Sequence, residues 1–242
     1  MNFLRKEDYS SQIQADNLNQ VIEKNDRYRI DAEGKALAEM DSYIAQRYLS
    51  DKVFRAMVDY DVARAYLYGE RFLYSVDSLA LEKDIYYIQN PSDYDTDTTY
   101  SVGTRVLYLG YVYQCSVIAL NHYPTETTYW TLIDTLELAT IAVGVTPTNT
   151  TLVTKGDNRN QALVMYLIDM TLYHLHCRIN PRNVPDIRAI RYNGNNATEN
   201  GGAIGWLKKV AKGEVSVSLD KIVPTQGSRV IYGSNAKQTH NY

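Results

Sequence analysis

The feature that most restricts the fold is a long apolar segment at residues 158–178, NRNQALVMYLIDMTLYHLHCR. Apolar side chains repeat at helical spacing along one side, and further apolar residues fill most of the remaining circumference. A helix that is apolar nearly all round has to be covered by other elements. The segment therefore predicts a central, buried helix with Asn158 as its N-terminal cap.

Helical patterns also precede this segment. Residues 3–24 predict one or two short helices that pack on something larger. Residues 31–48 hold a clear amphipathic repeat, and Asp31 is a suitable N-terminal cap for it. Residues 52–68 continue with a similar stripe of apolar side chains and predict a further helix.

The pattern after the central segment is shorter and more polar. Pro185 is placed to begin a short helix, because proline suits the first turn. Residues 203–219 predict a helix that Gly213 ends, since glycine adopts the left-handed conformation of a C-terminal cap. The last eighteen residues have no amphipathic pattern and predict an extended arm.

The middle of the chain has a different character. Helical periodicity is lost there, and glycine, proline and Asp-Thr clusters separate short runs with strand-like alternation, such as TYSVGTRVLYLGYVYQCSVI at 99–118. We therefore predict an α+β chain in which a helical domain of about four to five helices is interrupted by a small antiparallel β-sheet. The predicted regions are a first helical part at 1–70, an inserted β module at 71–158, a second helical part at 159–224 and an extended C-terminal arm at 225–242.

Composition allows two interpretations of the aromatic content. The chain of 242 residues has 22 tyrosines but only three phenylalanines. Tyrosine suits half-buried surfaces because its ring is apolar and its hydroxyl is polar. The excess indicates either a core in which tyrosine replaces phenylalanine or a protein rich in interfaces.

Charge is unevenly distributed along the chain. From Arg178 onward the net charge is +6, whereas the preceding residues carry −9. Opposite charges at the two ends favour head-to-tail self-association or docking on a charged partner, and a solvated basic tail is the alternative.

Targeting and cross-linking signals are weak. The N-terminus MNFLRKEDY carries charged residues from Arg5 onward and lacks the apolar segment of a signal peptide. The longest apolar run, LATIAVGV at 138–145, is far shorter than a membrane span. Cys115 and Cys177 are too few for a disulfide framework, and although one bridge between them is possible, their contexts in a strand and at a helix end do not favour it. We therefore expect a soluble protein that is made in a cytoplasm and has no membrane partner.

Several side-chain clusters in the sequence have residue types that could form a chemical site. Asp93, Asp95 and Asp97 alternate as in the first half of an EF-hand, but the glycine and the glutamate that complete such a loop are replaced by threonines, so a solvated acidic turn is the alternative. His174 and His176 point to different faces of one helix and cannot share a metal. Cys177 beside them lacks the other groups of a nucleophilic site. We expect no catalytic residue, no cofactor and no metal.

Basic residues near the end of the chain are candidates for binding anions. They could contact DNA phosphates, but the chain has no base-reading motif and is acidic as a whole, so an acidic protein is an equally suitable partner. These residues are Arg188, Arg191, Lys208, Lys209 and Lys212.

Taken without the middle region, the helical parts resemble the phage head–tail adaptor family of the Mu-like type. The matching segments occur in the family's order and cover about 150 residues in two blocks, although a further helix and the β module stand where the family has a short link. The segments are FLRKEDYSSQI, ALAEMDSYIAQRYLSDKVF, LVMYLIDMTLYHLHCRINPRNVPDIRAIRY, AIGWLKKVAKGEVSVSL and the Gly-Ser-Asn tail VIYGSNAKQTHNY.

The resemblance implies a structural virion protein without enzymatic activity, made in the host cytoplasm and located at the head–tail interface of the virion. Such adaptors form a ring, usually twelvefold, on the portal protein, continue the channel for packaged DNA and bind neighbouring neck and tail proteins. A C-terminal arm could add to a neighbour's sheet or groove. We expect its partner-binding residues to be Arg229, Val230, Ile231, Tyr232 and Tyr242.

The middle region resembles the short chitin-binding modules of bacterial chitinases. The resemblance rests on Tyr100, Gly103 and Val106, on the Tyr-Gln-Cys at 113–115, and on a following proline and tryptophan. It implies a glycan or protein contact, and the alternative function is then that of a glycan-binding accessory protein. The second interpretation is that Tyr113 and Trp130 form the core of a sheet too small to fold without large side chains. The candidate contact residues are Tyr100, Tyr108, Tyr113 and Trp130.

Overall fold

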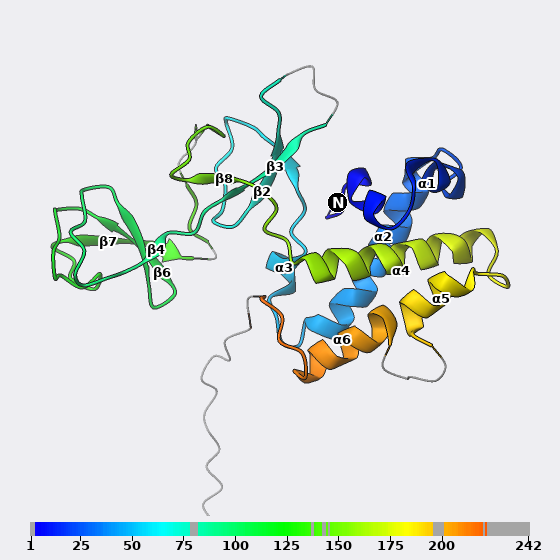
Figure 1. Cartoon of the computed structure of the whole chain (residues 1–242). Coiled ribbons are helices and arrows are strands. Elements are labelled where there is room, and N and C mark those ends of the chain that lie inside the picture. The colour runs from blue at the N-terminus through cyan, green and yellow to red at the C-terminus, as the bar shows by residue number, and fades with distance from the viewer. Residues whose placement is uncertain are drawn as a thin grey trace, which may run out of the picture.

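A computed structural model describes residues 3–77, 82–136, 138–141, 144, 146–195, 201–219 and 221. These residues form helices and two small sheets, so the predicted α+β class is confirmed (Figure 1). The helices are the 3-10 helix η1 (Lys6–Ser11), α1 (Ala15–Val21), α2 (Asp26–Ile44), α3 (Ser50–Val53), α4 (Gln161–Ile179), α5 (Asp186–Asn193) and α6 (Gly202–Lys212). The strands are β1 (Val58–Asp59), β2 (Arg71–Tyr74), β3 (Asp84–Ile88), β4 (Ser92–Asp93), β5 (Arg105–Tyr108), β6 (Tyr111–Cys115), β7 (Trp130–Thr135) and β8 (Val153–Lys155).

The predicted central helix is α4, which packs against α2, α5 and α6 (Figure 1). Most of its apolar side chains are buried, and those of Leu167 and Leu172 fully so, as its sequence predicts. The predicted cap is wrong by two residues. The side chain of Asn160 accepts the amides of Ala162 and Leu163, whereas the Asn158 side chain accepts a hydrogen bond from Arg71 on β2.

Helix α2 begins well before the predicted cap Asp31. Asn25 caps it by accepting the amide of Arg27. The first turns are then held by a buried ion pair of 3.0 Å between Arg29 and Glu33, a partnership that the apolar repeat alone does not reveal. Pro185 precedes α5 and Gly213 ends α6 with a φ of 79°, both as predicted.

The predicted helix over 52–68 is wrong beyond its first residues, because α3 ends at Val53. Val58 and Asp59 instead form β1, which pairs in parallel with β2. Tyr60 and Tyr66 then pack their rings against Phe72 of β2, with centroid distances of 5.4 and 5.1 Å. Strand pairing with β2 and ring packing on Phe72 therefore outweigh the helical spacing of apolar residues in this segment.

The strands form two four-stranded sheets, in the orders β1-β2-β3-β8 and β4-β5-β6-β7. Each begins with a short parallel pair and continues with antiparallel pairs. The structure thus differs from the single antiparallel sheet that was predicted. The second sheet contains the strand-like alternation predicted at 99–118, as the antiparallel hairpin β5–β6 and its flanks.

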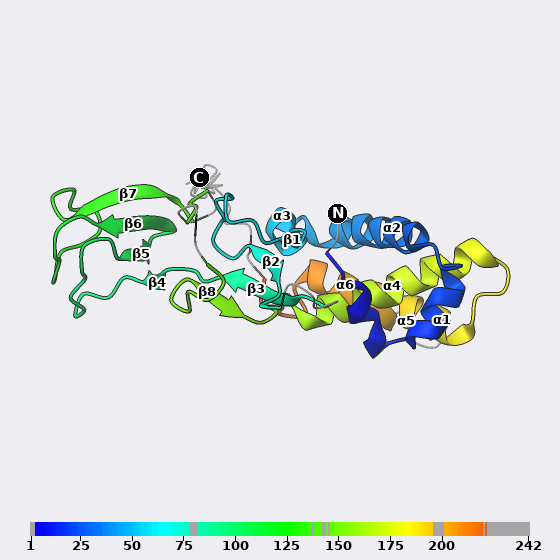
Figure 2. The same ribbon diagram turned by 90° about the horizontal axis from the view of Figure 1, so that it is seen from above.

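The two sheets extend away from the helices. The first sheet adjoins α3 and the start of α4, and the second lies at the end of the molecule opposite α1 and α5 (Figure 2). Three separate clusters of buried side chains correspond to the helical domain, the first sheet and the second sheet. Val112 of the second sheet belongs to the cluster of the first, so the two sheets share packing where they meet.

Candidate interaction surfaces

Two of the four aromatic residues predicted to contact a glycan or a protein lie in the core of the second sheet. Trp130 is only 1% exposed, and its indole Nε1–H donates to the carbonyl of His122 at 2.8 Å. Tyr100 is also buried, packs edge-on against Trp130 and accepts the amide of Asp95 through its hydroxyl. Neither ring has a free face for a sugar, so both residues fit the core interpretation.

The other two residues, Tyr108 and Tyr113, are half-buried and belong to a broader aromatic surface. Residues paired across antiparallel strands share one face of the sheet. Tyr108 pairs with Tyr111, and Tyr113 pairs with Leu132, so these four side chains lie on one face. The ring of Tyr123 contacts Tyr108 at 6.3 Å and extends the same surface.

This aromatic face consists of Tyr108, Tyr111, Tyr113, Tyr123 and Leu132. Three of its members are substantially exposed, namely Tyr111 at 43%, Tyr123 at 48% and Leu132 at 53%. Sequence reasoning missed these three, although the alternation of β6 already places Tyr111 and Tyr113 on the same side. An exposed surface of rings suits stacking or apolar contact with a partner.

A second surface combines basic and apolar side chains on α5 and α6. Arg191 forms an ion pair of 3.1 Å with Asp169 of α4, and Arg188 donates to the Gln12 carbonyl. Both arginines therefore help to hold α5 in place. Burial raises the pKa of Asp169, and the positive charges of Arg191 and Arg188 only partly offset this effect.

The apolar part of the surface is on α5. Ile187 is 56% exposed and Ile190 is 43% exposed, on a helix with no buried residue. On α6, Lys208 and Lys212 are exposed and Lys209 is half-buried. Apolar groups of α5 and cationic groups of α6 are thus exposed on two helices that pack against each other.

The histidine and cysteine residues weighed as chemical groups have structural contacts. His174 Nε2 lies 3.0 Å from the Glu39 carboxylate, and Glu39 also accepts the Tyr192 hydroxyl. Burial and the charge of Arg188 lower the pKa of His176, and the Cys177 side chain is half-buried. Within the described ranges, no three His, Cys, Asp or Glu side chains gather in a way that could hold a metal ion.

The acidic turn at 93–100 is held by its own side chains. Asp95 accepts the amide of Asp97 at 3.0 Å and the hydroxyl of Thr98 at 3.2 Å. These contacts agree with the solvated-turn alternative. None of the helices in the described part of the chain is long and apolar enough to cross a membrane.

The remaining predicted contacts belong to the C-terminal arm. Arg229, Val230, Ile231, Tyr232 and Tyr242 lie outside the described residues. Comparison with known proteins adds no assignment to any of these surfaces. The chain matches no protein family model, no curated protein and no solved structure.

Proposed function

We propose that the chain is a structural virion protein, a head–tail adaptor that forms a ring between the portal and the neck or tail of a phage particle. The observation that carries the proposal is the composition of the helical core. Its buried residues come from two blocks, Phe3–Phe54 and Leu163–Val217. These are the two blocks whose sequence resembles the adaptor family. Their joining into one domain, with the sheets inserted between them, supports the resemblance.

The charge and surface properties suit a ring of identical subunits. A heterologous contact joins one surface of a subunit to a different surface of the next. The basic and apolar surface on α5 and α6 offers Ile187 and Ile190 together with Lys208 and Lys212 to an acidic neighbour. In this proposal the ring continues the channel for packaged DNA, and the two sheets project from it toward other neck proteins.

Quantitative mass spectrometry of purified virions tests this function. The expected result is a copy number close to that of the portal protein, since ring and portal share one vertex. Absence from the virion, or hundreds of copies per particle, contradicts the adaptor function. Removal of residues 225–242 should leave a folded protein that fails to join the neck, and normal assembly of this truncated protein contradicts the role of the arm.

The exposed aromatic face favours a second candidate function, the binding of glycans by the second sheet. Because Trp130 is buried, its removal would disturb folding and cannot test glycan binding. The exposed rings of Tyr111 and Tyr123 are better probes. Binding on a glycan array that is lost in Tyr111→Ser and Tyr123→Ser variants with unchanged circular dichroism supports this candidate, and no binding by the wild-type protein removes it.

A further inference from the structure

A polar pocket lies where the helical domain meets the first sheet. It is lined by Arg55 after α3, Arg71 on β2, Asn90, and the segment Asn158–Asn160 that leads into α4. Tyr68, Leu136 and Ser218 also line it, so its walls come from six separate parts of the chain. The positive end of the dipole of α4 adds to the cationic character of the pocket.

Arg71 is the unusual group in this pocket. The residue is only 6% exposed to solvent. The guanidinium donates to the Asn158 side chain at 3.2 Å and to the backbone carbonyls of Arg55 and Val53 at 3.1 and 3.4 Å. All three acceptors are neutral, and the Nε of Arg71 has no hydrogen-bond partner.

The other buried arginines, unlike Arg71, form ion pairs with carboxylates. Arg29 is paired with Asp26 and Glu33, and Arg159 is paired with Asp8 and Asp157. No carboxylate within the described ranges lies at ion-pair distance from Arg71. Burying an arginine without an anion is costly, since the guanidinium stays charged in proteins.

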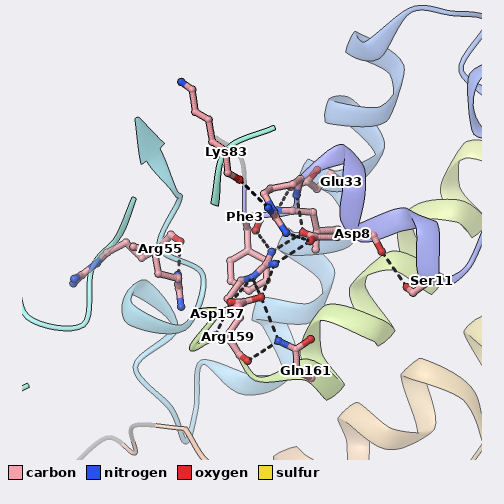
Figure 3. A network of polar contacts seen from close by, with 12 residues as sticks. Phe3, Asp8, Ser11, Glu33, Arg55, Lys83, Asp157, Arg159 and Gln161 are labelled. Atoms are coloured by element: carbon pink, nitrogen blue, oxygen red, sulfur yellow. Dashed lines mark hydrogen bonds and ion pairs between the residues drawn. The ribbon is translucent and has the colours of Figure 1, made fainter. Parts of the chain in front are cut away.

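A second positive charge lies close to that of Arg71. Arg159 and Arg71 both lie over the ring of Phe3, with each guanidinium carbon 5.6 Å from the ring centroid, and Figure 3 shows Phe3 beside Arg159 and Asp157. The Asp157 carboxylate is already held by Arg159 and Gln161. Burial, and then the positive charge of Arg159, lower the pKa of Arg71 to about 10.

We propose that this pocket binds a small oxyanion of the phosphate class, with Arg71 as the charged anchor and Arg55 as a further cation in the lining. A guanidinium presents its donors in a fork that matches a phosphate, and the buried Nε of Arg71 still lacks a hydrogen-bond partner. Asn90 and Asn158 add side-chain amides to the wall. The ligand is either free phosphate or a small phosphate monoester, because both present the same dianionic group.

Isothermal titration calorimetry of the full chain tests the site, with inorganic phosphate and a nucleoside monophosphate as probes at constant ionic strength. We expect saturable binding of at least one probe. Equal affinity for both assigns the free ion, and tighter binding of the monophosphate assigns the ester. Arg71→Gln should weaken binding about tenfold or more, since a charge-assisted hydrogen bond is lost.

A second variant guards against misfolding of the first. Arg55→Ala changes a half-buried side chain and should weaken binding about two- to fivefold. The matched control is Arg182→Ala, which removes an exposed cation outside the pocket and should leave the affinity unchanged. The proposal is overturned by wild-type protein that binds neither probe, or by Arg55→Ala and Arg71→Gln proteins that bind as tightly as the control.

Discussion

The helical domain and the second sheet solve the same packing problem with different side chains. The helical core is built mainly from aliphatic residues of α2, α4 and α6. The core of the second sheet is much smaller and consists of Tyr100, Val106, Cys115, Ala119 and Trp130. A small unit buries few side chains, so each of them has to remove a large area from water.

Tyrosine use follows from this difference. Thirteen of the 22 tyrosines lie between residues 58 and 155, where the sheets are. Their hydroxyls and the indole of Trp130 also bind loop backbone, as in the bond from the Asp61 amide to Tyr66 and the bond from Trp130 to the His122 carbonyl. A helix satisfies its own backbone, whereas the loops of a small sheet need such side-chain partners.

The strongest test of the comparison is Trp130→Ala. It removes the largest fully buried side chain and its hydrogen bond, and should destabilise the second sheet by about 3–5 kcal/mol. Hydrogen exchange should show loss of protection in β5, β6 and β7 while α4 stays protected. Tyr111→Ala is the control on the same sheet, with an expected effect below about 0.5 kcal/mol. Equal loss of protection in α4 would contradict separate cores.

The complementary change is Leu167→Ala at the centre of α4. Leu167 is fully buried, so the cavity should cost about 2–5 kcal/mol in the free energy of unfolding of the helical domain. Urea denaturation followed by far-ultraviolet circular dichroism measures the effect. Met165→Ala, on an exposed position of the same helix, should change stability little. Similar costs for both variants would show that α4 is not central.

The junction between the two regions should respond to acid through Asp157. Burial alone would raise the pKa of Asp157, but hydrogen bonds from Arg159 outweigh it and lower the pKa below 3.8. The charged carboxylate thus stabilises the fold above about pH 4, and this contribution is lost as the pH falls through the lowered pKa. Asp157→Asn should cost about 1–3 kcal/mol at neutral pH. Thermal melts should show the difference from wild type shrinking below pH 4, and a constant difference would refute the assignment.

The smallest expected effect concerns the start of α4. Asn160→Ala removes the cap of two amides and should destabilise the helical domain by about 1 kcal/mol. Asn183→Ala, at an exposed position between α4 and α5, is the matched control. Urea midpoints of the two variants give the measurement. If both midpoints equal that of the wild type, Asn160 does not act as a cap.

Sequence reasoning succeeded where a local pattern determines structure. The apolar circumference of α4 and the glycine after α6 identify a buried helix and a helix end without further information. It failed where contacts with residues distant in the sequence determine the local structure. Residues 58–68 became a strand and an aromatic cluster because Phe72 lies nearby, and no periodicity within 52–68 reveals that partner.

The candidate surfaces show the same division. Alternation places Trp130 and Leu132 on the same face of β7, and only the packing of Tyr94 and Tyr100 on Trp130 distinguishes the buried side chain from the exposed one. The pocket around Arg71 was not predictable, because Arg55, Asn90 and Asn158 reach it from distant parts of the chain. No sequence pattern reveals that an arginine will be buried without a carboxylate partner.

One guanidinium, that of Arg71, bonds both to the backbone of residues 53 and 55 and to the side chain of Asn158. The chain therefore leaves the helical domain and returns to it at neighbouring points. A short link between α3 and α4 would therefore be enough to close the helical domain without the two sheets, because their attachment points already lie side by side.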